Sequence, residues 1–175
     1  VTGDWSSDVC SSDLPVPPTF TEPYTKIAWC CKENCDDSGL LVAGGQTADT
    51  NPKNLTFIDL GMTPVYATSS WEVLANYFGG KNEITLPLPP NSQAGDFLLI
   101  PRSSPHFGGA QAPLAVICLL SSGELITMSF PSGFPISPTN QLHPSTFFVH
   151  PFITKANVSS LERPRWLSMM EKREQ

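Results

Sequence analysis

The chain has 175 residues, of which 40% are hydrophobic and 15% are charged, and its formal net charge is −6. This length is enough for one domain, and the apolar fraction argues against a disordered chain. No basic stripe suited to nucleic acid is present, and no apolar run reaches the roughly 18 residues of a membrane span. The 18 prolines disfavour a helical bundle and favour an all-β fold with many turns.

The first fourteen residues, VTGDWSSDVCSSDL, lack the basic and apolar regions of a signal peptide and show no helix or strand pattern. A common sequencing-library adaptor, translated in frame, encodes residues 4–13, and its last bases begin the codon of Leu14. We therefore expect residues 1–14 to be non-native and the native N-terminus to be missing. The Pro-rich stretch 15–23 follows as an extended lead-in.

Short apolar runs then alternate with turn signals, a pattern typical of antiparallel sheets. Three of these runs are predicted strands: 26–31, 39–45 and 54–61. Leu55 and Phe57 would share one face of the third strand, because successive side chains alternate between faces. The stretch 62–69 is a candidate fourth strand at a sheet edge, where Pro64 is tolerated.

The next stretch, SSWEVLANYFGG, predicts one short helix over residues 70–80. Ser70 is a candidate N-cap, and Glu72 would place a carboxylate in the first turn, where it suits the helix dipole. The glycines at 79–80 would end the helix. We expect this helix to pack on the sheets through Leu74 and Phe78.

The same helix carries the residues most suited to contact another protein. Trp71 opens the helix, and large aromatic side chains are enriched in binding surfaces. Asn76 and Tyr77 complete the candidate protein-contact surface. The alternative for Trp71 is packing within the fold.

Beyond the helix the strand rhythm returns. Predicted strands follow at 96–102, 114–120, 124–130 and 146–153. The segment 155–175 is expected to be loop and short helix, cut short, with Pro164 limiting where the helix begins. Trp166, Leu167 and Met170 would form a small apolar face on it.

Two blocks of the chain look alike. In each, an apolar strand (beginning at Leu40 and Leu114) is followed by a second strand and a turn. We read 24–154 as two to three WD40-like propeller blades, built as antiparallel four-stranded sheets, with a helical insertion at 69–95. So few blades cannot close a ring, so apolar sheet faces would stay uncovered. Trp29 is expected to pack between blades.

No motif points to catalysis, a cofactor or a metal. In WCCKENC the adjacent cysteines point to opposite strand faces, which suits no zinc site, and we expect reduced cysteines. The glycines of FGGKNE follow a helix instead of preceding one, unlike a P-loop. SSPHFGG lacks the elbow of a serine hydrolase. The carboxylates are scattered, and nothing selects a pair. A hydrolase-like propeller enzyme, with its active site in missing blades, remains the alternative.

Several phrases together resemble one family. They are FTEPYTKIAWCCKEN, GLLVAGG, LTFIDLGMTPVYATSSWEVLANYF, FLLIPRSSPHFGGAQAPLAVICLLSSGELITMSFPSG and RPRWLSMM. This set resembles the conserved C-terminal region of the lethal giant larvae and tomosyn family, most closely its fungal branch, over residues 20–170. No short binding motif of the family maps onto these residues.

The resemblance implies a cytoplasmic, non-enzymatic protein of two β-propellers that needs no cofactor. Members bind t-SNAREs at the plasma membrane and act in polarised exocytosis, and fungal members serve a secretory Rab GTPase. Exocyst components are further implied partners. The resemblance also implies no nucleic acid, and membrane association only through partners.

Overall fold

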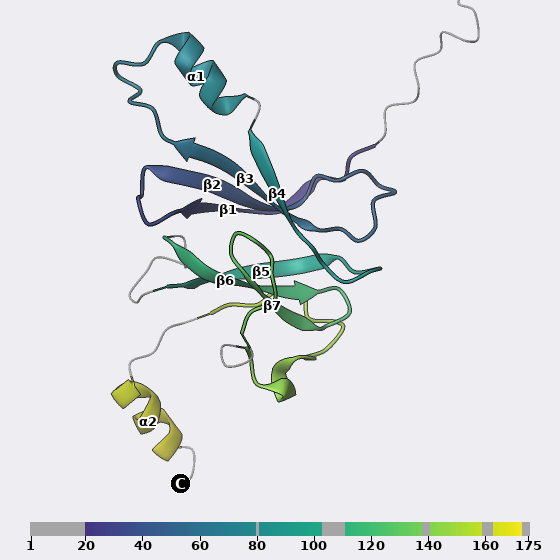
Figure 1. Cartoon of the computed structure of the whole chain (residues 1–175). Helices are drawn as coiled ribbons and strands as arrows, with labels where there is room; N and C mark the ends of the chain where they lie inside the picture. The colour runs from purple at the N-terminus through teal and green to yellow at the C-terminus, as the bar shows by residue number, and fades with distance from the viewer. Residues whose placement is uncertain (1–19, 80, 103–110, 138–140, 159–162, 173–175) are drawn as a thin grey trace, which may run out of the picture.

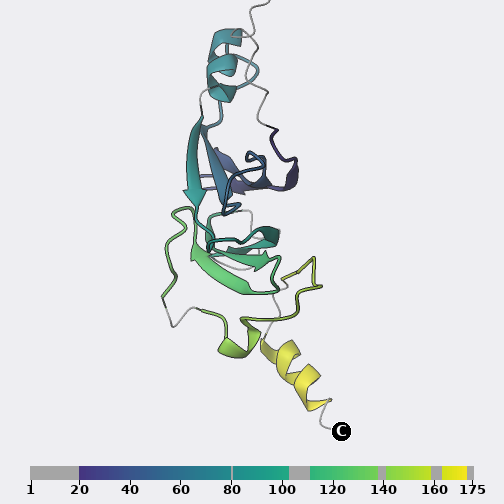
Figure 2. The ribbon, with the colours of Figure 1, turned by 90° about the vertical axis from the view of Figure 1, so that its right-hand side faces the viewer.

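The chain folds into two antiparallel β-sheets stacked face to face, with short helices at opposite ends of the stack (Figures 1 and 2). The computed structural model describes residues 20–79, 81–102, 111–137, 141–158 and 163–172. The expected non-native segment 1–14 and the serines and histidine of SSPHFGG lie outside these ranges.

Sheet 1 contains four strands in the order of the chain. They are β1 (Tyr24–Cys31), β2 (Asp37–Gly44), β3 (Leu55–Met62) and β4 (Asn82–Leu86). Helix α1 (Trp71–Phe78) lies between β3 and β4 in the chain and projects beyond the end of the sheet (Figure 1). In the pairing register, Leu41 of β2 stands between Ala28 and Phe57.

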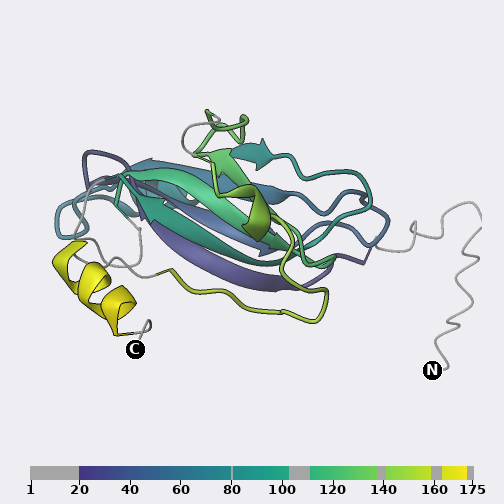
Figure 3. The same cartoon turned by 90° about the horizontal axis from the view of Figure 1, so that it is seen from below.

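Sheet 2 contains three strands, again in chain order. They are β5 (Ala94–Pro101), β6 (Pro113–Leu120) and β7 (Leu125–Ser129). A 3-10 turn, η2 (Pro144–Thr146), and helix α2 (Arg163–Glu171) follow. Seen from below, the strands of the two sheets overlap with similar directions (Figure 3), as expected for aligned sheet packing.

The hydrophobic core lies between the two sheets. Alternating side chains of each strand point into it, because the side-chain period of a strand is two. Its fully buried members include Cys30, Leu41, Leu55, Phe57, Leu86, Phe97, Val116, Cys118 and Leu120. The Phe57 ring meets Phe130 edge to face, with centroids 4.9 Å apart. Gly39 permits this packing, since a Cβ there would lie 2.5 Å from the Phe57 ring.

The prediction of an all-β, propeller-like fragment is confirmed by this arrangement of two packed antiparallel sheets with only short helices. The predicted strands at 26–31, 39–45, 54–61, 96–102, 114–120 and 124–130 correspond to β1, β2, β3, β5, β6 and β7. The prediction of four strands in each sheet holds for sheet 1, whereas sheet 2 has three among the described residues.

Two predicted strands are wrong. The segment 62–69 forms a turn, in which the backbone N–H groups of Thr68 and Ser69 bond to the Val65 carbonyl. The fourth strand of sheet 1 is instead β4, beyond the helix. The segment 146–153 is no strand and forms one isolated β-bridge, between Phe148 and Glu124.

Trp29 does not pack between the two sheets. Its neighbour Cys30 points into the core, so Trp29 points to the opposite side of sheet 1, where half of its side chain is exposed. The side of sheet 1 on which Trp29 lies therefore follows from the alternation of side chains along β1, whatever the aromatic character of the residue.

Candidate interaction surface

Helix α1 is held by the caps that its sequence predicts. The Ser70 side chain accepts a hydrogen bond from the Val73 N–H at 3.4 Å, and Ser70 has the extended backbone of an N-cap. At the other end, the Gly79 N–H donates to the Ala75 carbonyl at 2.8 Å. Glu72 lies in the first turn. These contacts define a helix of eight residues that stands beside the sheets.

Tyr77 anchors this helix, and the expected packing through Phe78 is wrong. Tyr77 is 7% exposed, whereas Phe78 is 60% exposed and Leu74 is half-buried. The Lys81 ammonium lies 4.1 Å from the centroid of the Tyr77 ring, and the Tyr77 hydroxyl lies 3.5 Å from the Thr63 hydroxyl. Tyr77 is therefore a packing residue and no part of an exposed contact surface.

The other two predicted contact residues are exposed but lie on different faces. Trp71 is 79% exposed, and Asn76 is exposed as well. At about 100° per residue, Asn76 lies about 140° around the helix axis from Trp71. Ala75 and Phe78 follow Trp71 at spacings of four and seven and share its face. We call Trp71, Ala75 and Phe78 the α1 apolar face.

This face has no covering element among the described residues. All three of its side chains are exposed. Val65 and Tyr66, in the turn that leads to the helix, are 65% and 56% exposed. Large apolar side chains that gather at an exposed site are typical of protein-binding surfaces. The signal available in the sequence was the helical spacing of Trp71 and Phe78; their exposure required the structure.

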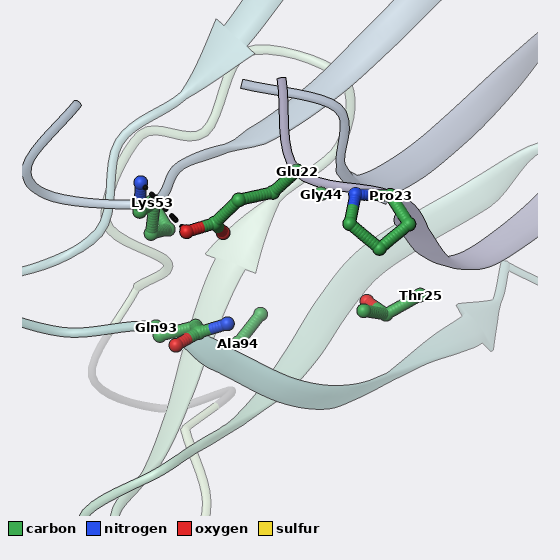
Figure 4. A pocket seen from close by; sticks show the side chains of 7 residues that line it. All are labelled: Glu22, Pro23, Thr25, Gly44, Lys53, Gln93 and Ala94. Carbon is green, nitrogen blue, oxygen red and sulfur yellow. Dashed lines mark ion pairs between the residues drawn. The ribbon is translucent and has the colours of Figure 1, made fainter. Parts of the chain in front are cut away.

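One small pocket is lined by residues that hold neighbouring loops together. It lies between the sheets near Glu22 and Gln93 and has a volume of about 150 Å³ (Figure 4). Small-molecule sites usually measure about 300–1,000 Å³. Lys53 borders it, and its ammonium binds Glu22 at 3.2 Å and the carbonyls of Thr47 and Ala48 at 2.8 Å each. These contacts use the lysine to join loops, which leaves no free cation for a ligand.

A larger pocket of about 300 Å³ lies along β7. Glu124, Leu125, Ile126 and Thr127 form one wall, and Gln141 and Phe147 form the other. Glu124 is its sole ionisable residue, and its carboxylate accepts a hydrogen bond from the Ser122 hydroxyl. This pocket offers no pair of groups for acid–base chemistry.

Three aspartates on the sheets, Asp37, Asp59 and Asp96, form ion pairs with lysines. The Lys32 ammonium lies 3.2 Å from Asp37 and 3.1 Å from Asp59. Burial works against the charge of Lys32, but its hydrogen bonds to the two carboxylates outweigh this and raise its pKa. Asp96 is bound in the same way by Lys26 at 2.6 Å. These groups are therefore engaged in structural ion pairs.

The described cysteines are free thiols. Burial raises the pKa of Cys30 and of Cys118 to about 12, so both stay protonated and poorly nucleophilic at neutral pH. Within the described ranges, no cluster of three or more histidine, cysteine or acidic residues could hold a metal ion. No described helix has the length and apolarity to cross a membrane.

Two fungal proteins match most of the chain. The "Lethal(2) giant larvae protein homolog SRO77" of Saccharomyces cerevisiae is 32% identical over 154 residues, which cover 87% of this chain. The chain belongs to the lethal giant larvae and tomosyn family. An uncharacterised protein of Schizosaccharomyces pombe is 27% identical over 137 residues, or 76% of the chain.

This member of the lethal giant larvae family spans a small part of its relatives. The matched residues cover 15% of the budding-yeast protein and 13% of the fission-yeast protein. No family model matches the chain. Both relatives are fungal, in agreement with the branch that the sequence motifs resemble.

Proposed function

We propose that this chain is part of a non-enzymatic scaffold that regulates SNARE-dependent polarised exocytosis. It binds t-SNAREs, and a secretory Rab GTPase and exocyst components are further partners. It acts in the cytoplasm and reaches secretion sites at the plasma membrane through those partners. The observation that carries this proposal is the 32% identity to a lethal giant larvae homologue over 87% of the chain.

The state of the polar groups supports a scaffold over an enzyme. Asp37, Asp59 and Asp96 are each bound by a lysine. General acid–base catalysis instead needs a group that can exchange a proton with a substrate. The two core thiols, Cys30 and Cys118, are buried and protonated. The described part of the chain therefore offers apolar surface for binding and little machinery for a reaction.

We propose the α1 apolar face as a contact for t-SNARE helices. Trp71 and Phe78 lie about two helical turns apart on one side of α1. An apolar stripe of this length can pack against the apolar side of another helix. Tryptophan is also the kind of residue that concentrates binding energy in an interface.

A pull-down with the complete gene product tests the proposal. Immobilised t-SNARE cytoplasmic helices should retain it above the level of an unrelated propeller protein. The double variant W71A/F78A should lower retention about tenfold or more, because it removes both large apolar contacts. N76A is the matched control on the polar side of the same helix, and we expect retention within about twofold of the unchanged protein.

The pull-down tests t-SNARE binding and the place of α1 in that binding as two separate questions. Retention no higher than that of the unrelated propeller protein would refute the proposal of t-SNARE binding. Retention that W71A/F78A leaves unchanged would keep the binding and remove α1 as its site. Circular dichroism of each variant would check that the fold is intact.

A further inference from the structure

Helix α2 lies apart from the two sheets and is exposed along its whole length (Figures 1 and 2). Every residue from Arg163 to Glu171 is exposed. Within the described parts of the chain, the Ser168 hydroxyl has no hydrogen-bond partner, and neither Arg163 nor Arg165 has an ion-pair partner. The polar side chains of this helix are therefore free to meet another molecule.

The sequence of this helix places two arginines shortly before a serine. In RPRWLSM, Arg163 and Arg165 lie five and three residues before Ser168, and Met169 directly follows it. No other serine or threonine of the chain has two arginines among the five residues before it. Protein kinases select their substrates by charge patterns of this kind. A kinase with an acidic substrate groove would bind both guanidinium groups, since carboxylates form bidentate pairs with arginine.

The two arginines can bind one acidic groove only when this segment is extended. In the helix Arg163 and Arg165 are separated by about 200° around the axis, because each residue turns by about 100°. In an extended chain, residues two apart point to the same side and lie about 7 Å from each other. Recognition of this pattern therefore requires that α2 opens.

Helix α2 is suited to open in this way. It has nine residues, whereas isolated helices shorter than about 12–15 residues are marginal in water. Its charges also oppose the helix dipole, because Arg163 and Arg165 lie in the first turn and Glu171 lies in the last. None of its side chains is buried, so opening the helix exposes little apolar surface.

We propose that Ser168 is phosphorylated by a serine/threonine kinase that selects arginines five and three residues before its target. The Ser168 Oγ attacks the γ-phosphorus of ATP, so that the Oγ–P bond forms, the bond from this phosphorus to the β,γ-bridging oxygen breaks, and ADP leaves. The hydroxyl proton passes to the catalytic aspartate of the kinase. This modification involves no residue of α1 and does not depend on t-SNARE binding.

Phosphorylation removes the positive charge of this segment. Three basic residues and one acidic residue give residues 163–172 a net charge of +2. A phosphoserine adds a charge of about −1.5 to −2 at neutral pH, which makes the segment nearly neutral. Lys172 follows Ser168 at a spacing of four, so the phosphate can pair with its ammonium when the helix forms again.

A different pattern at the same serine comes from Glu171. This residue lies three positions after Ser168, where a kinase that selects acidic substrates would read a carboxylate. Glu171 is a single acid followed directly by Lys172, whose positive charge weakens it as a signal. The two arginines therefore favour a kinase with an acidic groove, and substitutions at the two sets of residues distinguish the classes.

The complete gene product, expressed in yeast cells and purified with phosphatases inhibited, tests the proposal. Peptide mass spectrometry, after digestion with a protease that does not cleave at arginine, measures the phosphorylated fraction of Ser168. We expect phosphate at Ser168 in the unchanged protein and an at least tenfold lower fraction in R163A/R165A. E171A is the matched control in the same helix, and its phosphorylated fraction should stay within about twofold of the unchanged protein.

Three results would overturn the proposal. They are an unmodified Ser168 in the unchanged protein, a phosphorylated fraction that R163A/R165A leaves unchanged, and a fraction that E171A lowers while R163A/R165A does not. The third result would assign the site to a kinase that selects acidic substrates. Both variants should keep the melting temperature of the unchanged protein, since they alter only exposed side chains. R163K/R165K keeps both positive charges and should retain more phosphate at Ser168 than R163A/R165A.

Discussion

Lys26 and Asp96 join the two sheets by a short ion pair. The Lys26 ammonium, on β1, lies 2.6 Å from the Asp96 carboxylate, on β5, and also donates to the Phe97 carbonyl at 2.7 Å. The same carboxylate accepts the backbone N–H groups of Phe97 and Ala156 at 2.9 and 3.0 Å. One buried carboxylate thus holds sheet 1, sheet 2 and the C-terminal segment together.

Removing this carboxylate should destabilise the chain. We expect Asp96→Ala to lower the free energy of unfolding by about 2–3 kcal/mol, because Lys26 and two backbone N–H groups lose their acceptor. Urea unfolding measures the difference. Glu83→Ala is the control, since Glu83 is an exposed residue on an edge strand, and its effect should stay within about 0.5 kcal/mol. Equal effects of the two substitutions would contradict this role for Asp96.

The Asp96 carboxylate should also make the stability of the chain fall in acid. Burial tends to raise the pKa of Asp96, but the hydrogen bonds from Lys26, Ala156 and Phe97 outweigh it, and the pKa lies below its ordinary value. Stability from this group is therefore complete above the unfolded pKa of about 3.9 and is lost as the pH falls through the lower folded pKa.

Unfolding curves between pH 2 and 7 would show this loss. Asp96→Asn cannot titrate at this position, so its stability should decline less than that of the unchanged chain below about pH 4. Parallel declines in the two proteins would show that other carboxylates cause the acid sensitivity.

Helix α1 should depend on Tyr77 more than on Phe78. We expect Tyr77→Ala to destabilise the helix by about 2 kcal/mol, because the buried ring and its contact with Lys81 are lost. Phe78→Ala should cost less than about 1 kcal/mol, since most of that ring is exposed. Hydrogen exchange of the amides of α1 measures both effects. Greater loss of protection in Phe78→Ala would show that the anchor is misassigned.

The packing of Phe57 should fail if Gly39 gains a side chain. A Cβ at this position would lie 2.5 Å from both the Phe57 ring and the Ile58 carbonyl oxygen, so Gly39→Ala should cost about 2 kcal/mol or more. Gly95→Ala is a matched control within a strand, because its nearest contact would be an ordinary 3.5 Å. Thermal unfolding compares the two, and similar melting temperatures would refute the steric argument.

Local signals in the sequence were sufficient for most elements. The strands β2 and β6 were predicted from short apolar runs, and α1 from a capping serine and a terminal glycine. These signals act between residues close in the chain. The predicted fourth strand of sheet 1, at 62–69, forms a turn at Val65 in the structure, and 82–86, beyond the helix, pairs with β3 instead.

That Trp71, Asn76 and Tyr77 contact another protein stays a prediction, and the structure decides only which of them are exposed. Trp71 and Asn76 are exposed, whereas Tyr77 is buried and Phe78 shares the exposed face of Trp71. Both rings lie on an apolar side of the helix, and helical spacing does not tell which part of that side meets the sheet. Lys81, the residue before β4, lies over the Tyr77 ring, and this contact turns the Tyr77 side of the helix toward the sheet.

The sequence by itself determined the all-β class, the order of the main strands and the family, because these depend on residue types and their spacing. Only the tertiary structure decided which apolar residues are covered. Trp29 and Cys30 are neighbours in one strand, yet Cys30 is buried in the core and Trp29 stands on an open face. Burial depends on which face of an element meets another element, and that is a property of packing between distant segments.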